Sequence, residues 1–369
     1  MSEGGSLSPP SLGDPAPRPR WRVWSLRVVL GGFVAALLGW SALNLSHGEP
    51  PAALWSSDDL PAVPAPEVNG WNDLHQHPDL FRGLDTGEVD EVVRVVLQAG
   101  LGVPPPASAA LDPARSALDR AEIKQAWEIC EASLGRTEFV DACPLDFSGV
   151  CPGLDVLECQ RLGSFHVIEA AARGEWSQAA GRADVLMAQR LGHVRSARSP
   201  LGMMIALRGA REGMELSSRL VRWARAAHAE PALAALQRRL GGFAAEEIDL
   251  TPALVGEYLL GRTGAERIGS GEVDSGGGAL PRFFFDPGAT VAELNRIYRP
   301  ARLAAGTSVL PDLPAEPYTA HFGWWIRNPL GKLYLDTVLP PRRVFEDLVA
   351  ERAALIEQRA ELGALLDAH

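Results

Sequence analysis

Two histidines in the segment Asn72–Asp79 have the spacing of a metal-binding pair. His75 and His77 are separated by one residue, and Asp73 and Asp79 lie close to them in the chain. Imidazole and carboxylate are common zinc ligands, so this H-x-H pattern is a weak candidate for a metal site. In metal-dependent hydrolases such a pair normally ends a strand, and the remaining ligands come from other strands. Because this segment is typical of a loop, we predict a polar loop without a metal, and no cofactor elsewhere in the chain.

Four acidic residues surround one predicted helix start: Glu246, Glu247, Asp249 and Glu257. Paired carboxylates can do general acid–base work, but the helix dipole by itself favours acidic residues at this position. Glu257 is the weak catalytic candidate because it lies inside the helix, between Val255 and Leu259. We favour a buried Glu257 that pairs with an arginine over a catalytic one.

The C-terminal part of the chain contains a cluster of aromatic residues: Tyr318, His321, Phe322, Trp324 and Trp325. Tyr318, Trp324 and Trp325 are candidate ligand or interface residues, since their rings combine a large apolar area with a polar group. The simplest interpretation is that the cluster packs into the core against the last helix. Contact with a membrane interface or a partner protein, and stacking on sugar rings of a cell-wall polymer, are the alternatives.

Several catalytic and binding motifs are absent from the sequence. The chain contains no G-x-S-x-G, H-E-x-x-H or G-x-x-x-x-G-K-[ST] pattern, and neither of its two lysines, Lys124 and Lys332, stands in S-x-x-K. A Ser/His/Asp triad assembled across the fold stays open, because triads are defined by geometry. The formal net charge of −11 argues against nucleic acid as a partner, since phosphate binding needs a basic surface.

The four cysteines lie close together in the sequence: Cys130, Cys143, Cys151 and Cys159. They form no C-x-x-C motif, which argues against a zinc ribbon and a thioredoxin-like redox pair. An even number of cysteines outside the cytoplasm favours two disulfides. Of the three possible pairings we favour the nested one, Cys130–Cys159 outside Cys143–Cys151, because an antiparallel helical hairpin would bring the outer pair together. Buried free thiols are the alternative.

Val28–Leu45 is an 18-residue run without a charged side chain. A helix of this length covers roughly 27 Å, enough for a thin hydrocarbon core. Four arginines precede the run and acidic residues follow it, which by the positive-inside rule leaves the N-terminus in the cytoplasm. We therefore predict a single-pass anchor in a bacterial inner membrane, with the bulk of the chain in the periplasm. A signal peptide cleaved near Ser46-His47-Gly48 is the alternative.

Composition divides the chain into six segments: a disordered cytoplasmic tail (1–27), a transmembrane helix (28–45), a linker (46–70), a helical exported domain with the disulfide-linked hairpin (71–267), a Gly/Ser-rich loop (268–281) and a C-terminal helical segment that packs on the core (282–369). Apolar periodicity and cap residues predict helices over 87–99, 112–133, 155–173, 176–191, 199–227, 231–240 and 250–260, from 290 onward, and over 341–367. We expect 307–341 to be irregular. Since no segment alternates like a strand, the predicted fold is all-α: an irregular multi-helix domain with antiparallel hairpins.

The last predicted helix carries a leucine stripe at heptad spacing: Leu348, Leu355 and Leu362. We predict that this stripe docks on the helical core. A short coiled coil with a second copy of the chain is the alternative.

Two short motifs, Phe284-Phe285-Asp286-Pro287 and Asn328-Pro329-Leu330-Gly331, lie in the C-terminal segment. Together with the anchor and the helical body, they make the chain similar to a class of bacterial single-pass envelope proteins. The resemblance implies an N-terminal anchor and a helical exported body, and it implies no activity.

Taken together, the sequence predicts a membrane-anchored protein of the cell envelope. Its expected partners are the lipid bilayer, through Val28–Leu45, and a protein of the envelope that binds grooves of the helical domain. An interaction, scaffold or accessory role is favoured over an enzyme. An envelope hydrolase that uses carboxylates such as Glu257, and a glycan-binding module with Trp324 or Trp325 facing solvent, are the alternatives.

Overall fold

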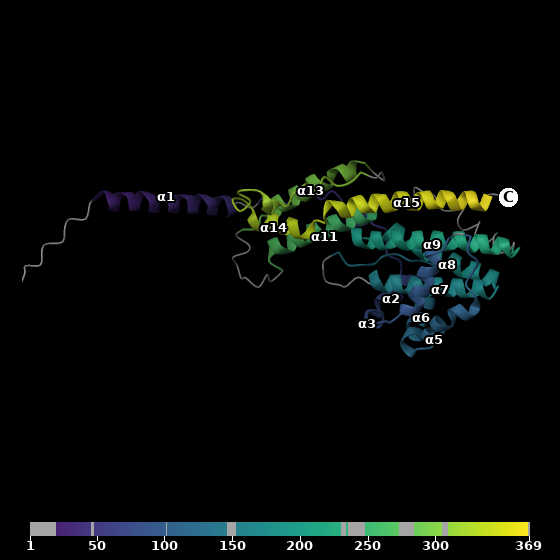
Figure 1. The fold of residues 1–369 in the computed structure, drawn as a ribbon. Coiled ribbons are helices and arrows are strands. Elements are labelled where there is room, and N and C mark those ends of the chain that lie inside the picture. The colour runs from purple at the N-terminus through teal and green to yellow at the C-terminus, as the bar shows by residue number, and fades with distance from the viewer. Residues whose placement is uncertain are drawn as a thin grey trace, which may run out of the picture.

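The computed structural model of the chain describes residues 20–45, 48–100, 102–145, 153–229, 234, 248–272, 284–304 and 309–367. In these ranges the protein is all-helical and contains no strand, which confirms the predicted fold class. The α-helices, in chain order (Figure 1), are α1 (Arg20–Leu45), α2 (Gly70–His75), α3 (Pro78–Phe81), α4 (Gly87–Gln98), α5 (Asp112–Leu118), α6 (Ala121–Leu134), α7 (Gly153–Ala172), α8 (Trp176–Ser196), α9 (Pro200–Ala226), α11 (Thr251–Ser270), α13 (Pro287–Leu303), α14 (Pro329–Val338) and α15 (Arg342–Asp367).

The long helices α7, α8 and α9 form the centre of the body and pack side by side in sequence order. Gly174 has a φ of 75° and makes the tight turn between α7 and α8, a conformation that glycine adopts without strain. Ala179, Ala180 and Ala183 on α8 are buried, and their small side chains let neighbouring helices approach closely. The hairpin predicted between 155 and 191 is therefore present.

The C-terminal helix α15 lies along α9 (Figure 1). Leu348, Leu355 and Leu362 are fully buried, so the predicted docking of the leucine stripe on the core is confirmed. An ion pair between Arg211 on α9 and Glu351 on α15 adds to the contact of the two helices. Burial of an intact apolar stripe is the main stabilising term of such a surface helix.

Three local predictions are wrong. The helix expected over 112–133 is broken into α5 and α6, because Arg120 has an extended backbone conformation with φ −65° and ψ 135°. The helix expected from Thr290 begins at Pro287, and its N-cap is Asp286, whose side chain accepts a hydrogen bond from the Ala289 amide at 2.9 Å. The segment expected to be irregular contains α14, which begins with Asn328 as N-cap and proline at its first position. The helix predicted over 231–240 lies outside the described residues, apart from residue 234.

The sequence predicts a linker over 46–70. In the structure the segment 48–61 is not free but packs against α11 and α13. Trp55 is buried and makes edge contacts with Tyr258 and Tyr298, at ring-centre distances of 5.5 and 6.2 Å. The Leu54 amide donates to the Tyr258 hydroxyl at 3.0 Å, and Asn295 donates to the Ala52 carbonyl at 2.9 Å. Because aromatic burial and satisfied backbone groups fix this segment, it holds the chain after α1 against the body.

The packing of α6 and α7 brings Cys130 and Cys159 together, as predicted, but they do not form the predicted outer disulfide. Cys130 on α6 and Cys159 on α7 are buried and within hydrogen-bonding contact, yet both are free thiols. Burial raises the pKa of Cys130 well above its usual value, which disfavours the thiolate needed to form a disulfide. Cys143 is disulfide-bonded. Cys151, its predicted partner, lies outside the described residues, so that pairing stays a prediction.

A buried asparagine, Asn328, joins three separate parts of the chain. Its side-chain oxygen accepts from the amides of Asp286 (2.8 Å) and Gly331 (3.1 Å), and its nitrogen donates to the Thr290 hydroxyl (3.0 Å). Its own amide donates to the side-chain oxygen of Asn44 on α1, at 2.9 Å. Asn328 adopts a left-handed backbone, with φ 47° and ψ 51°, which asparagine tolerates better than most residues.

The helix α1 projects from the body beside α14 (Figure 1). Its C-terminal end contacts the body through Asn44 and Trp40. The Trp40 indole donates to the Trp325 carbonyl at 2.9 Å, and its ring lies 4.9 Å from that of Phe284. Helix α1 begins at Arg20, inside the predicted disordered tail, and residues 1–19 lie outside the described residues. No helix in the described part of the chain reaches the length and apolarity that a membrane crossing requires.

We predict that Asn328→Ala lowers the free energy of unfolding by about 3 kcal/mol, because it removes buried hydrogen bonds and places an alanine in a left-handed conformation. Asn328→Gly removes the same hydrogen bonds but relieves the backbone strain, so it should cost about 1 kcal/mol less than the alanine variant. Urea unfolding of the full chain in detergent measures both values. Equal midpoints for wild type and the two variants would contradict this role of Asn328.

Candidate binding groove

The weak metal candidates, His75 and His77, are not assembled into a site with other ligands. His75 ends α2 and His77 is the N-cap of α3, and both side chains are exposed. Within the residues that the structure describes, no group of three or more His, Cys, Asp or Glu side chains is arranged to hold a metal. The polar loop predicted around this pair takes the form of two short helices.

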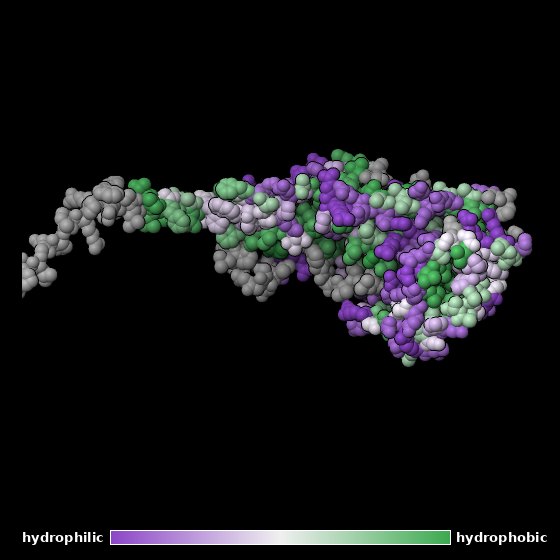
Figure 2. All heavy atoms as spheres, viewed as in Figure 1, coloured by the Kyte–Doolittle hydropathy of each residue, from purple (hydrophilic) through white to green (hydrophobic). Residues whose placement is uncertain are grey.

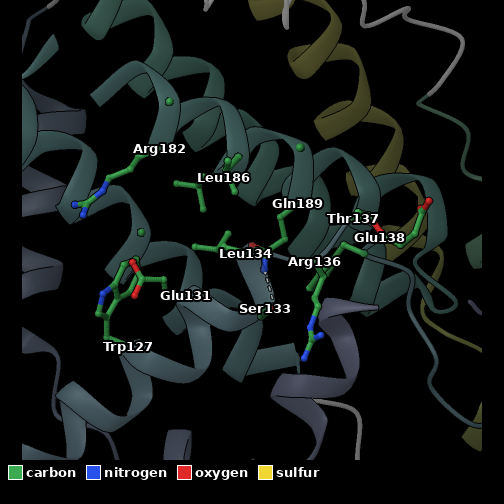
Figure 3. A pocket seen from close by; sticks show the side chains of 16 residues that line it. Trp127, Glu131, Ser133, Leu134, Arg136, Thr137, Glu138, Arg182, Leu186 and Gln189 are labelled. Carbon is green, nitrogen blue, oxygen red and sulfur yellow. Dashed lines mark hydrogen bonds between the residues drawn. The ribbon is translucent and has the colours of Figure 1, made fainter. Parts of the chain in front are cut away.

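A half-open groove of about 590 Å³ lies between the C-terminal end of α6 and one face of α8 (Figure 3). This volume lies within the range of about 300–1,000 Å³ that small-molecule sites occupy. Its apolar wall is formed by Trp127, Leu134, Val185 and Leu186. Charged side chains of both signs surround this wall, among them Glu131 and Arg182.

Helical periodicity explains how α8 lines the groove. Gly181, Val185 and Gln189 repeat every four residues, which places them on one face of the helix. Gly163 on α7 lies beneath this face, where an added Cβ would approach the Leu186 side chain to 3.1 Å. The close approach of α7 therefore sets the depth of the groove, because a larger side chain there would push Leu186 outward.

The segment that follows α6, residues 135–139, lines the rim of the groove. Hydrogen bonds and an ion pair join this rim segment to α2 and to the residues just before it. Arg136 pairs with Asp73 at 2.8 Å and also donates to the Glu67 carbonyl at 2.7 Å. The Asn69 side chain accepts from the Val140 amide and donates to the Val140 carbonyl, both at 2.9 Å. Since these bonds hold both ends of the rim segment, the groove is largely preformed.

The polar centre of the groove is the amide of Gln189, which is only 4% exposed. Its nitrogen donates to the Ser133 hydroxyl at 3.3 Å, and that hydroxyl donates in turn to the Gly70 carbonyl at 2.8 Å (Figure 3). The Gln189 side-chain oxygen has no hydrogen-bond partner among the described residues. A buried acceptor without a donor costs about 1–3 kcal/mol, so this oxygen is an uncompensated polar atom just beneath the surface of the groove.

One end of the groove is closed by an aromatic pair. The rings of Trp127 and His166 lie 4.1 Å apart. Burial, and then the nearby Arg182 guanidinium, lower the pKa of His166 to about 4, so the imidazole is neutral at pH 7. The neutral ring contributes an apolar surface behind Trp127 rather than a charge.

A second, shallower cavity of about 420 Å³ lies between the segment 102–105 and the end of α9. Trp223 lines it, and its indole donates to the Val103 carbonyl at 2.8 Å. The polar group of the tryptophan is therefore already satisfied, and no unpaired polar atom faces this cavity in the described residues. It offers a ligand less specific chemistry than the groove.

Glu257, the catalytic candidate, lies on α11 and lines neither cavity. Burial raises its pKa to about 7, and among the described residues no arginine pairs with it, so the expected Glu–Arg pair is not found. Glu257 in turn raises the pKa values of the Tyr298 and Tyr334 hydroxyls, to a smaller extent than burial does. A carboxyl of this kind can hold a proton at neutral pH, but it does not line either of the two cavities described above. Glu246 and Glu247 lie outside the described residues, and Asp249 caps the start of α11 by accepting from the Thr251 amide at 2.9 Å.

Only part of the aromatic cluster packs into the core, where the sequence predicts core packing against the last helix. Tyr318 packs against the main core, whereas Phe322 is fully exposed. The Tyr318 hydroxyl donates to Glu293 on α13 at 2.5 Å, and the amides of Tyr318 and Thr319 donate to Asp336 on α14 at 2.7 and 2.9 Å. These bonds hold the segment beside α14. Trp324 is half-buried, whereas Trp325 is 50% exposed.

The residues of the groove were not found in the sequence as a site. Leu134 lies far from Val185 and Gln189 in the chain, and all three look like ordinary helix positions. Only the contact of α6 with α8 brings them together. The one available signal is the spacing of Gly181, Val185 and Gln189, which predicts a shared helix face but does not reveal that this face stays uncovered.

Comparisons with protein-family models, with curated proteins and with solved structures find no match for this chain. The function must therefore be argued from the geometry and chemistry of its sites.

We predict that Glu257 makes stability depend on pH. Its pKa is about 7 in the folded protein and near 4.5 in the unfolded chain, so the folded state binds the extra proton and stability falls as the pH rises from about 4.5 to 7. Glu257→Gln removes this loss and should raise the free energy of unfolding at pH 8 by on the order of 3 kcal/mol, with little change at pH 4. Urea unfolding of both proteins at the two pH values tests this, and an equal effect of the substitution at pH 4 and pH 8 would refute it.

Proposed function

We propose that this protein is a single-pass membrane protein of the bacterial envelope that binds a polypeptide partner in the groove between α6 and α8. In this proposal α1 is the anchor, the N-terminus is cytoplasmic, and the body lies in the periplasm. The observation that carries the proposal is the exposed apolar surface of α1.

The apolar side chains of α1 face away from the rest of the protein on all sides of the helix. Eight of them are between 43% and 68% exposed: Val28, Val29, Leu30, Phe33, Val34, Leu37, Leu38 and Leu43. Figure 2 shows this hydrophobic surface on the projecting helix. In water such a surface is unfavourable by about 25 cal/mol for each Å² of apolar area, and insertion into hydrocarbon removes that cost.

The length of the whole helix α1 supports anchoring, whereas its described residues alone do not reach the length and apolarity that a crossing requires. The helix has 26 residues and so extends for about 39 Å, while its described side chains, from Val28 to Asn44, cover about 25 Å. Hydrocarbon cores are about 30 Å thick, and shorter apolar segments are accommodated by local thinning of the bilayer. The backbone hydrogen bonds of a helix are satisfied internally, as a bilayer requires.

The groove supports binding of a polypeptide rather than catalysis. Its wall is apolar, its rim carries Glu131 and Arg182, and the unpaired oxygen of Gln189 is buried just beneath its surface. In this proposal an apolar side chain of the partner contacts Leu134 and Leu186, and the Gln189 side chain turns toward the groove so that its oxygen accepts from a backbone N–H of the partner. Glu257, the catalytic candidate, does not line this groove.

The first test concerns the anchor. Val34→Lys together with Leu37→Lys places two charges near the middle of the apolar run, each unfavourable in a bilayer by about 2.5–3.5 kcal/mol. We expect wild-type protein to resist extraction from bacterial membranes by alkaline carbonate and the double variant to appear in the soluble fraction.

The matched control is Leu201→Lys with Leu303→Lys, which changes two exposed apolar residues of the body. This variant should stay in the membrane fraction as wild type does. Extraction of the wild-type protein by carbonate would overturn the anchor.

The second test concerns the groove. A photo-crosslinking amino acid at Val185, on the groove wall, should form a discrete adduct with a partner protein in intact cells. The same amino acid at Val95, an exposed position on α4 outside the groove, should form none.

Gln189→Met removes the buried acceptor while keeping the side-chain volume, so stability should change by less than about 1 kcal/mol. Binding should weaken by about tenfold, and the Val185 adduct should fall accordingly. Equal adducts at Val185 and Val95, or an adduct that Gln189→Met leaves unchanged, would contradict a partner site in the groove.

A further inference from the structure

The loop 321–327, between η4 (Tyr318–Ala320) and α14, exposes apolar side chains beside the base of α1. Phe322 is fully exposed, Trp325 is 50% exposed, and Ile326 is 44% exposed. On α14 itself Leu333 is also exposed. Exposed aromatic residues grouped in this way are unusual on a water-facing surface and mark an interaction site.

This loop is bonded to α1 near the C-terminal end of its apolar run. The Trp40 indole donates to the Trp325 carbonyl, and the Asn44 side chain donates to the Ile326 carbonyl, each at 2.9 Å. The loop therefore lies at the level of residues 40–44. If α1 is inserted in a bilayer, that level is the boundary between hydrocarbon and headgroups, where tryptophan is enriched.

The charge of this region differs from that of the whole chain. Residues 321–335 contain Arg327 and Lys332 and no acidic residue, although the chain as a whole carries a net charge of −11. Arg327 is exposed, and the Lys332 ammonium donates to the Trp324 carbonyl at 3.1 Å, which keeps it beside the aromatic loop. Basic groups at a membrane surface are attracted to anionic headgroups by about 1 kcal/mol each.

We propose that the loop 321–327 is a second membrane contact, which inserts Phe322 and Trp325 into the outer interface of the bilayer and seats the body on the lipid surface. This inference rests on the proposed insertion of α1. Because the hydrogen bonds from Trp40 and Asn44 tie the loop to the anchor, insertion of α1 brings the loop to the bilayer without further ordering. The body is then held at a fixed tilt instead of swinging on a flexible linker.

The experiment places an environment-sensitive fluorescent amino acid at one of three exposed positions in the full-length protein: Phe33, Phe322 or Leu303. Each protein is reconstituted into vesicles of phosphatidylethanolamine and phosphatidylglycerol that carry brominated acyl chains, which quench only fluorophores that reach the hydrocarbon or its boundary. Phe33 reports insertion of α1. Phe322 reports the loop, and Leu303, at the far end of α13 from Pro287, is the matched body control.

We expect loss of fluorescence at Phe33 and Phe322, and none at Leu303. Loss at Phe33 without loss at Phe322 would overturn the membrane contact while leaving the anchor intact, and it is the result expected if the aromatic loop binds a glycan instead. No loss at Phe33 would overturn the anchor itself. Equal loss at all three positions would overturn the membrane contact, since it would mean adsorption of the whole body.

Discussion

The architecture depends most on the buried hydrogen bonds of Asn328. One side chain caps α14, accepts from the backbone that begins α13, and donates to the Thr290 hydroxyl, while its own amide binds Asn44 of α1. These groups are removed from water, so each would be costly if its partner were lost. The direction in which α1 leaves the body is therefore set by a buried polar network rather than by apolar contact alone.

This constraint separates the molecule into a part that faces α1 and a part that contains the groove. Around Asn328, helices α11, α13 and α14 and the segment 48–61 form the region next to α1 (Figure 1). Beyond it, α6, α7 and α8 form the groove, with α9 and α15 packed behind α8. With α1 in a bilayer, the groove would be presented away from the lipid at a defined orientation, which suits a protein that engages a partner near the membrane surface.

Glu257 and Gln189 are two of the polar residues in the body that carry an uncompensated buried group, and they have different consequences. Glu257 lines neither of the two cavities described above, so its raised pKa is treated as a matter of folding stability and pH. Gln189 lines the groove, although its unpaired oxygen is buried, so a turn of this side chain would let a ligand relieve the same kind of deficit. Position beside a groove, rather than the degree of perturbation, distinguishes a candidate site from a strained part of the core.

The amino-acid sequence by itself determined the helical class, the hairpin of α7 and α8, and the docking of α15, because each follows from apolar periodicity and local turn chemistry within one segment. The Asn-Pro start of α14 was also readable from local capping rules, although the surrounding aromatics and prolines obscured it. Only the tertiary structure decided that Trp55 fastens the supposed linker, that Cys130 and Cys159 approach as free thiols, and that Trp325 is exposed. It also decided that Gln189 faces a groove, since this depends on which helix face its neighbours leave uncovered. These outcomes depend on contacts between residues distant in the chain, and such contacts leave no periodic signal in the sequence.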